Sequence, residues 1–213
     1  MTSRTLVLPY FDTLELTGAA QPGFANYEKL SPVRAGTVVA GLRAAHHRGR
    51  WHRFFDEIIF SENTYSFSYT HKPLLLYFYE HDWGDASRAH LQQLNALRAE
   101  LSLHQVNLLV VTAFSLPQFR ELSRTAGLLL DVLEDRGNEL ASLLGLYADQ
   151  SPSWGRYAGI ERNVALPGLY LLDGLRQVAL ACANEAISDH LPLDAVLSTL
   201  QPTDHYQAER KSA

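Results

Sequence analysis

The alternation of apolar runs with amphipathic stretches after Lys72 is the feature of this sequence that most constrains its fold. Residues 73–80 (PLLLYFYE) and 106–114 (VNLLVVTAF) are apolar almost throughout, which is typical of strands covered on both faces of a parallel sheet. Between them, residues 85–101 carry leucines at steps of three and four, so these leucines share one face of a helix. The succession predicts a strand–helix–strand unit with Asp85 as the N-cap of its helix.

Further helices and strands follow residue 114. Ser115 and Gln118 have the spacing of a capping box, which predicts a helix that begins there and ends before Gly127. Asp173-Gly174 between two apolar runs predicts a β-hairpin. The other expected elements are a strand at 128–135, a short helix at 137–146 capped by Asn138, hairpin strands at 168–173 and 176–184, and a helix at 191–201. The order β–α–β–α–β–α–loop–β–β–α predicts an α/β sandwich of three layers.

The chain before Lys72 is less regular. Residues 1–35 predict an N-terminal arm that packs on the main domain or on a partner subunit. Residues 41–55 have the pattern of a short helix, although Gly49 disfavours one. Residues 56–60 and 65–70 flank a turn-like SENT and predict a β-hairpin. The expected boundaries are an arm at 1–35, a domain at 36–203 and a flexible tail at 204–213.

Composition and charge exclude several classes of function. The 213 residues are 46% hydrophobic and carry a net charge of −5, which fits a globular chain and gives no reason to expect nucleic-acid binding. No run of 18 apolar residues is present and the first 16 residues are too polar for a signal peptide, so we expect a cytoplasmic protein without a membrane span. His46, His47 and His52 lack metal-ligand spacing and Cys182 is the single cysteine, so we expect no metal and no cofactor.

Three stretches resemble the thioredoxin-like fold in its alkyl hydroperoxide reductase/thiol-specific antioxidant (peroxiredoxin-like) branch. They are KPLLLYFYEHDWGDASRAHLQQLNAL (72–97), LLLDVLEDRGNELASLLGL (128–146) and VALPGLYLLDGLRQVALA (164–181). We therefore expect a three-layer α/β/α thioredoxin-like fold with a central mixed sheet, an N-terminal β-hairpin and an N-terminal extension. The resemblance also implies that Pro167 is a cis-proline that faces the active-site turn.

The turn that follows Trp83 departs from the family in its chemistry. Gly84 stands where the resemblance places the first redox cysteine, or the threonine of true peroxiredoxins. Ser87 stands where it places the second cysteine, which is peroxidatic in peroxiredoxins, and Asp85 replaces a proline. Peroxide reduction and disulfide exchange need a thiolate, which a serine hydroxyl cannot replace. The family's catalytic residues are therefore not carried over to this chain.

Two residues remain as candidate nucleophiles. Ser87 has His90 three residues later and His81 six residues earlier, but no G-x-S-x-G elbow, so a capping serine is favoured over a hydrolytic one. Cys182 alternates in phase with Val178 and Leu180, which favours a buried, inert thiol. The alternative is an exposed thiol that senses oxidant or cross-links two chains.

A group of polar and aromatic residues surrounds the same turn and predicts a binding surface. The loop 147–167 is long enough to be functional or interfacial, and we expect it to pack beside Trp83. The candidate binding residues are His81, Asp82, Asp85, Arg88, Trp154 and Arg162.

The leading hypothesis is a non-catalytic protein that binds a partner protein, a second copy of itself as a homodimer, or a small ligand through the surface around Trp83, Ser87 and Pro167. The alternative is a peroxidase or thiol-disulfide oxidoreductase with antioxidant activity that uses Cys182 and an outside reductant.

Overall fold

The computed structural model describes residues 29–39, 43–45, 51–53, 58–60, 65–67, 72–154, 157, 159–183 and 190–201. Between residues 43 and 67 it describes backbone pairing only. No described helix is both long and apolar enough to cross a membrane. The side chains of His46, His47 and His52, and the expected tail at 204–213, lie outside the described residues.

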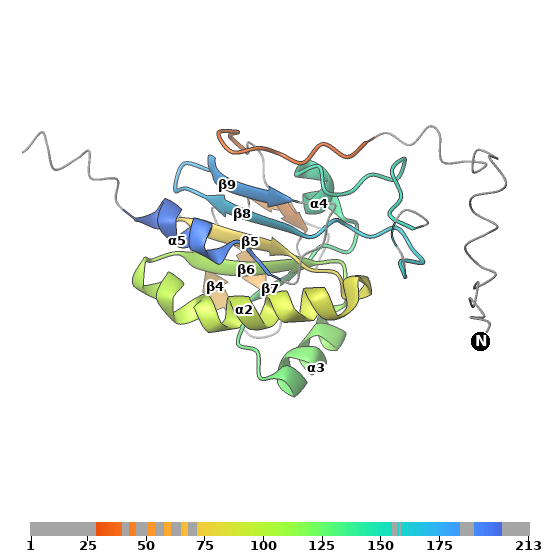
Figure 1. Cartoon of the computed structure of the whole chain (residues 1–213), viewed down its shortest axis with the longest axis horizontal. Coiled ribbons are helices and arrows are strands. Elements are labelled where there is room, and N and C mark those ends of the chain that lie inside the picture. The colour runs from red at the N-terminus through yellow and green to blue at the C-terminus, as the bar shows by residue number, and fades with distance from the viewer. Residues whose placement is uncertain are drawn as a thin grey trace, which may run out of the picture.

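A five-stranded mixed sheet forms the centre of the molecule (Figure 1), in the order β7-β6-β5-β8-β9. The strands β5 (Leu74–Phe78), β6 (Asn107–Thr112) and β7 (Val132–Glu134) are parallel. The strands β8 (Gly168–Leu172) and β9 (Val178–Ala183) are antiparallel to their neighbours and form the expected hairpin. All five residues of β5 and of β8 are buried, as their apolar sequences predict for strands covered on both faces.

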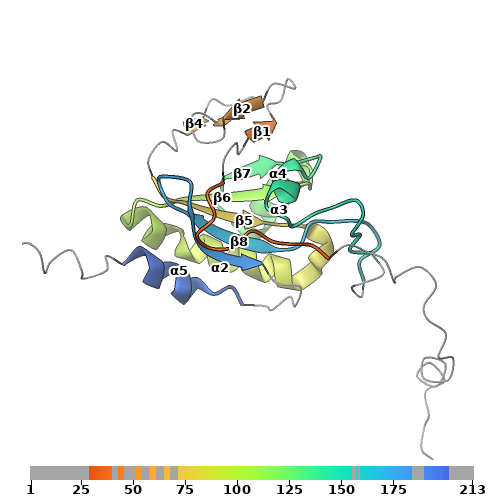
Figure 2. The ribbon, with the colours of Figure 1, turned by 90° about the horizontal axis from the view of Figure 1, so that it is seen from above.

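Helices cover both faces of this sheet, so the three-layer fold expected from the sequence is confirmed. Figure 2 shows α2 (Gly84–Leu103) and α5 (Leu193–Leu200) on one side and α4 (Glu139–Leu143) on the other. Side chains of α3 (Leu116–Ala126) pack into the same apolar cluster as those of α2 and α5. Alternate residues of β5 feed the two cores: Leu75 and Tyr77 pack under α2, whereas Leu76 packs with α4.

The long helix α2 has the apolar face that its sequence predicts. Leu91, Leu94, Leu97 and Leu101 are all buried against the sheet. Its first residue is Gly84 and its N-cap is Trp83, so the expected N-cap at Asp85 is wrong. Gly84 has φ 64°, a conformation that favours glycine, and it lets the chain turn into the helix one residue before Asp85.

Two small antiparallel hairpins precede the main sheet. β3 (Ile58–Phe60) pairs with β4 (Tyr65–Phe67), which confirms the expected hairpin. β1 (Arg43–Ala45) pairs with β2 (Trp51–Arg53) where the sequence pattern predicted a helix over 41–55, so that prediction is wrong. Gly49 lies between the two strands in the sequence, and its low helix propensity favours an interrupted segment over a continuous helix.

The described residues 29–39, which include the end of the expected N-terminal arm and are called the arm from here on, pack on their own chain. Gly36 N donates to Val178 O (2.8 Å) and Val39 N to Arg176 O (3.0 Å), so this segment runs beside the start of β9. Val33 N then donates to Leu144 O at 3.0 Å, at the end of α4. Residues 1–28 lie outside the described residues, so the expected domain boundaries stay predictions.

Candidate functional site at the ends of the parallel strands

The carboxyl ends of β5, β6 and β7 meet at one edge of the sheet. Tyr79 N donates to Val111 O (2.8 Å) and Asp135 N to Thr112 O (2.7 Å), which ties the three strand ends together. From β5 the chain passes through a 3-10 turn, η1 (His81–Trp83), directly into α2. Of the site residues expected from the sequence, His81, Asp82 and Trp83 therefore lie at the edge where parallel sheets commonly bind ligands.

Ser87 lies in the first turn of α2 and is only 1% exposed. Its Oγ donates a hydrogen bond to Gly84 O at 3.0 Å, so its hydroxyl satisfies the backbone of its own turn. Asp85 is 96% exposed and forms an ion pair with Arg88 (3.4 Å). Ser87 is a buried structural hydroxyl and Asp85 is a charge on the surface.

Trp83 joins the turn to the long loop before β8. It is 7% exposed, and its Nε1 donates to Ala165 O at 2.9 Å. Its ring meets Tyr157 edge-on, with 5.1 Å between centroids. Pro167 lies two residues after Ala165 and precedes Gly168, which pairs with Phe78 at the end of β5. No described peptide bond is cis, so the cis conformation expected for Pro167 is wrong.

A second connection holds the loop at the turn. Arg162 Nε donates to Asp82 Oδ2 at 2.7 Å, and the two residues are 80 positions apart in the sequence. Ser153 Oγ accepts from Val164 N (2.7 Å), and the Ser153 backbone N donates to Asn163 Oδ1 (3.0 Å), which closes the loop on itself. Loop 147–167 therefore packs beside Trp83, as its sequence position predicted.

Aromatic rings surround the base of the turn. The ring of His81 stacks on Phe114 with 5.1 Å between centroids and 11° between planes. The Tyr79 hydroxyl lies 3.3 Å from His81 Nδ1. Burial raises the pKa of Tyr79 to about 12, although Arg88 and a hydrogen bond with Ser87 oppose the rise. The Tyr79 hydroxyl therefore remains protonated at neutral pH.

The most unusual group of the site is Glu80, which sequence reasoning missed. Its side chain is buried with 4% exposed, and Oε1 accepts a hydrogen bond from Ala113 N at 2.9 Å. Burial raises the pKa of Glu80 to about 7, with nearby Asp82 and Asp135 adding to the rise while Ala113 N–H and Arg162 oppose it. The available signal was an acidic residue directly after a fully apolar strand.

Asp135 is the second buried acid at this edge. Its carboxylate accepts hydrogen bonds from the backbone N–H of Glu139, Leu140 and Ala141 at 2.9–3.2 Å. Asn138 occupies the N-cap position of α4 as expected, but its side chain makes no capping hydrogen bond. Burial raises the pKa of Asp135, and the three N–H groups oppose that rise. Asp135, rather than Asn138, caps α4.

Glu80 makes the stability of the fold depend on pH. Its pKa rises from 4.5 to about 7 on folding, so its contribution is fully present below pH 4.5 and is lost as pH rises through 7. Because a change of one in pKa corresponds to about 1.4 kcal/mol, the free energy of unfolding falls by roughly 3 kcal/mol over this range. Glu80→Gln keeps an acceptor for Ala113 N–H but cannot ionise. We therefore expect the free energy of unfolding of Glu80→Gln, relative to that of wild type, to rise by roughly 3 kcal/mol between acidic and alkaline pH.

Urea unfolding of both proteins across this pH range measures the change. Asp135 is present in both proteins, so its own titration largely cancels in the difference between them. Two stability curves that stay parallel between pH 4.5 and 8 would contradict the assignment of a neutral, buried Glu80.

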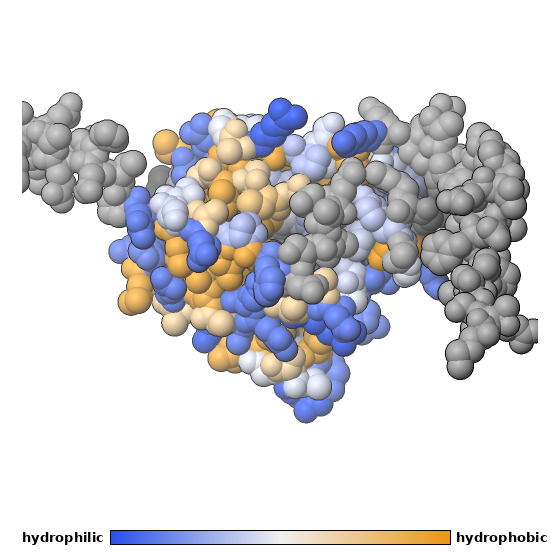
Figure 3. All heavy atoms as spheres, viewed as in Figure 1, coloured by the Kyte–Doolittle hydropathy of each residue, from blue (hydrophilic) through white to orange (hydrophobic). Residues whose placement is uncertain are grey.

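Cys182 lies apart from the turn, on the edge strand β9 opposite Leu169. It is half-buried and packs with Leu180 on the α2–α5 face of the sheet, where Figure 3 shows apolar side chains gathered around β9 and α5. Burial raises the pKa of its thiol. Val178 packs on the opposite face, which corrects the expectation that it is in phase with Cys182. The cause is an extra residue in β9, since Leu171 pairs with Leu180 but Leu172 with Val178.

Trp154 is 43% exposed, in the same loop as Arg162.

The structure brings His81, Asp82, Trp83 and Arg162 together around the turn, and Ser87 is buried in the first turn of the helix that follows. Among the described residues, no three His, Cys, Asp or Glu side chains are gathered as ligands for a metal ion.

Comparisons with known proteins agree with this fold. A family model described as the AhpC/TSA family matches residues 60–181, which is more than half of the chain. Peroxidoxin BcpB from Mycobacterium tuberculosis has a TM-score of 0.57 at 15% identity, covering 79% of this chain and 96% of its own. A Cys-to-Ser mutant of PrxQ from Xylella fastidiosa has a TM-score of 0.59 at 15% identity. The match covers 80% of this chain and 96% of the PrxQ chain.

Bacterioferritin comigratory protein from Xanthomonas campestris, which was studied for its alkyl peroxide reduction activity, has a TM-score of 0.56 at 19% identity and covers 80% and 97% of the two chains. At these identities the likeness concerns the fold. No curated protein matches the chain.

Proposed function

We propose that this chain, which belongs to the AhpC/TSA family, acts by binding a partner and without thiol chemistry. The observation that carries the proposal is the state of Ser87. This residue stands at the position where the resemblance places the peroxidatic cysteine, and it is buried with its hydroxyl bonded to Gly84 O. A serine there has no thiolate to attack a peroxide and no sulfenic acid to form.

The charges around Ser87 also disfavour thiol chemistry. A reactive thiolate is stabilised by nearby cations and by the positive end of a helix. Here the turn carries the acids Asp82 and Asp85, and the Arg162 guanidinium is already paired with Asp82. These acidic side chains oppose the formation of a thiolate at residue 87.

Cys182 supports the alternative, thiol-dependent function poorly. A reactive cysteine is exposed and has a lowered pKa, whereas Cys182 is half-buried and its pKa is raised by burial. It packs among aliphatic side chains on the edge strand and not at the ends of the parallel strands. These features favour its interpretation as a small apolar side chain of the core edge.

The binding surface that we propose is the rim around Trp83. Arg162 is 61% exposed and Arg88 50% exposed at their side chains, and Trp154 is 43% exposed. Tryptophan and arginine are enriched in the energetically important centres of protein interfaces. We favour a protein as the partner, either another protein of the cytoplasm or a second copy of this chain in a homodimer. A small ligand is the alternative occupant.

Cysteine-dependent peroxide consumption tests the absence of thiol chemistry. Peroxide loss is followed with dithiothreitol as reductant, for wild type and for Cys182→Ser. We expect both proteins to consume peroxide at the rate of reductant alone, because neither carries a reactive thiolate. Turnover that disappears in Cys182→Ser would favour the thiol-dependent alternative.

A further inference from the structure

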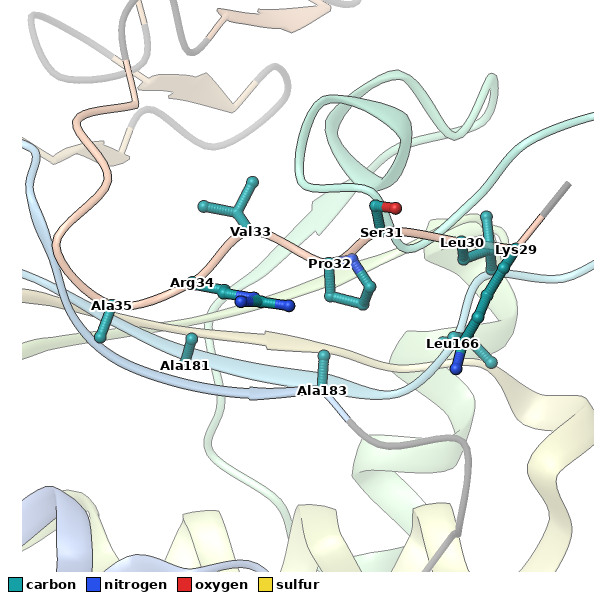
Figure 4. Close-up of a pocket in the computed structure, with 10 residues that line it drawn as sticks. All are labelled: Lys29, Leu30, Ser31, Pro32, Val33, Arg34, Ala35, Leu166, Ala181 and Ala183. Carbon is teal, nitrogen blue, oxygen red and sulfur yellow. The ribbon is translucent and has the colours of Figure 1, made fainter.

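A pocket of about 590 Å³ that is open to solvent, called the cavity below, lies between the N-terminal arm and strand β9 (Figure 4). It forms because the arm pairs with only the first part of β9. Gly36 N donates to Val178 O and Val39 N to Arg176 O beside the start of β9. The residues that precede Gly36 leave the strand and cross to α4, where Val33 N donates to Leu144 O. The backbone of residues 29–35 is thereby held away from Ala181 and Ala183, and this separation creates the space.

The arm is fixed at both ends of this span. Leu30 (9% exposed) and Val39 (4% exposed) are both buried in the apolar core on the α4 side. The backbone of Ser31 packs directly on Gly145, where an added Cβ would lie 2.2 Å from Ser31 O. Gly145 has φ 71° and is thus suited to glycine on two grounds. The cavity is therefore bounded by anchored backbone on the arm side and by the sheet below.

The cavity has an apolar floor and two positive charges. Leu166, Ala181 and Ala183 form the strand side, and Pro32 faces them from the arm. Figure 4 shows the Lys29 and Arg34 side chains extending from the arm into the space above these residues. Within the described part of the chain, neither cation forms an ion pair. None of the described residues that line the cavity is acidic.

We propose that this cavity binds an organic anion that has an apolar body and one terminal carboxylate. The volume falls within the range of small-molecule sites, about 300–1,000 Å³. The Arg34 guanidinium matches the two oxygens of a carboxylate, and the Lys29 ammonium, which ends beside Leu166, adds positive charge to the lining. The alanines and Leu166 leave room for an aliphatic body against the strands. The inference does not rest on the proposed function.

Isothermal titration calorimetry of the full chain tests the proposal, with decanoate, decanol and acetate as probes. We expect saturable 1:1 binding of decanoate alone, because decanol lacks the charge and acetate lacks the apolar body. Lys29→Gln/Arg34→Gln should weaken decanoate binding about tenfold or more, since hydrogen bonds to charged groups are lost. Arg120→Gln, which changes an exposed cation on α3, is the matched control and should leave binding unchanged.

A second variant tests the floor of the cavity without altering charge. Ala181→Leu places extra methyl groups in the cavity and should abolish decanoate binding while its circular dichroism spectrum remains that of wild type. The proposal is overturned if wild type shows no saturable decanoate binding, or if decanol binds as tightly as decanoate. It is also overturned if Lys29→Gln/Arg34→Gln and a folded Ala181→Leu both bind decanoate as wild type does.

Discussion

Trp83→Ala should lower the free energy of unfolding by about 3–5 kcal/mol, the range for removal of a large buried aromatic side chain. Trp83 is 7% exposed, packs in the core on the α4 side and meets the Tyr157 ring edge-on. It also connects η1 to the loop before β8, because its Nε1 donates to Ala165 O. Its removal leaves a cavity in the core, and it leaves Ala165 O in the loop before β8 without its hydrogen-bond donor. Urea denaturation of wild type and variant measures the loss.

Trp154→Ala is the matched control for this substitution. Trp154 belongs to the same loop but is 43% exposed, so its removal should cost about 1 kcal/mol or less. Trp83→Phe keeps one aromatic ring but loses the N–H and part of the indole volume, so we expect a loss smaller than that of Trp83→Ala, of about 2–3 kcal/mol. Equal losses for Trp83→Ala and Trp154→Ala would contradict the role of Trp83 as the anchor of the loop.

Asp135→Ala should cost about 2–4 kcal/mol, because one buried carboxylate caps the start of α4. Its oxygens accept from the N–H groups of Glu139, Leu140 and Ala141, and Leu140 and Ala141 are themselves buried. An alanine leaves these N–H groups without an acceptor, and a lost cap and buried unpaired donors each cost about 1–2 kcal/mol. Chemical denaturation near pH 7 measures the loss.

Asn138→Gly is the control that separates two interpretations of this helix. The sequence predicts Asn138 as the cap, but its side chain makes no capping hydrogen bond, and its φ of 53° suits glycine. We therefore expect this variant to retain wild-type stability within about 0.5 kcal/mol. A loss in Asn138→Gly as large as that in Asp135→Ala would contradict the capping role of Asp135.

The sequence predicts the main sheet and its helices well because their signals are local. Apolar runs mark β5 and β6, and leucine spacing marks the buried face of α2. The sequence places the N-cap of α2 two residues too late, at Asp85, because the start of the helix depends on the positive φ of Gly84, which the spacing of apolar residues does not reveal. The phase of Val178 was also wrong, since a bulge depends on the pairing partner as well as on the strand itself.

The site was predicted only in part because its key contacts join distant segments. The Glu80 carboxylate is held by Ala113, which lies 33 residues later, and Asp82 meets Arg162 from 80 residues away. Their residue types and positions beside a strand end could be noted in the sequence. The burial of Glu80 and its raised pKa could not be predicted from the sequence, because both depend on how β5 packs against β6 and the loop that follows β6. The candidate rim of Asp82 and Arg162 was named from the sequence, and the structure brings these two residues together.

Peroxide consumption with dithiothreitol tests the central claim most directly, because it asks whether any thiol in this chain turns over. A cysteine-containing peroxiredoxin serves as the positive control, and Cys182→Ser serves as the matched variant. The account predicts that wild type and Cys182→Ser both match the background rate, since Ser87 stands at the redox position and Cys182 is half-buried with a raised pKa. Sustained consumption by wild type that Cys182→Ser abolishes would contradict it.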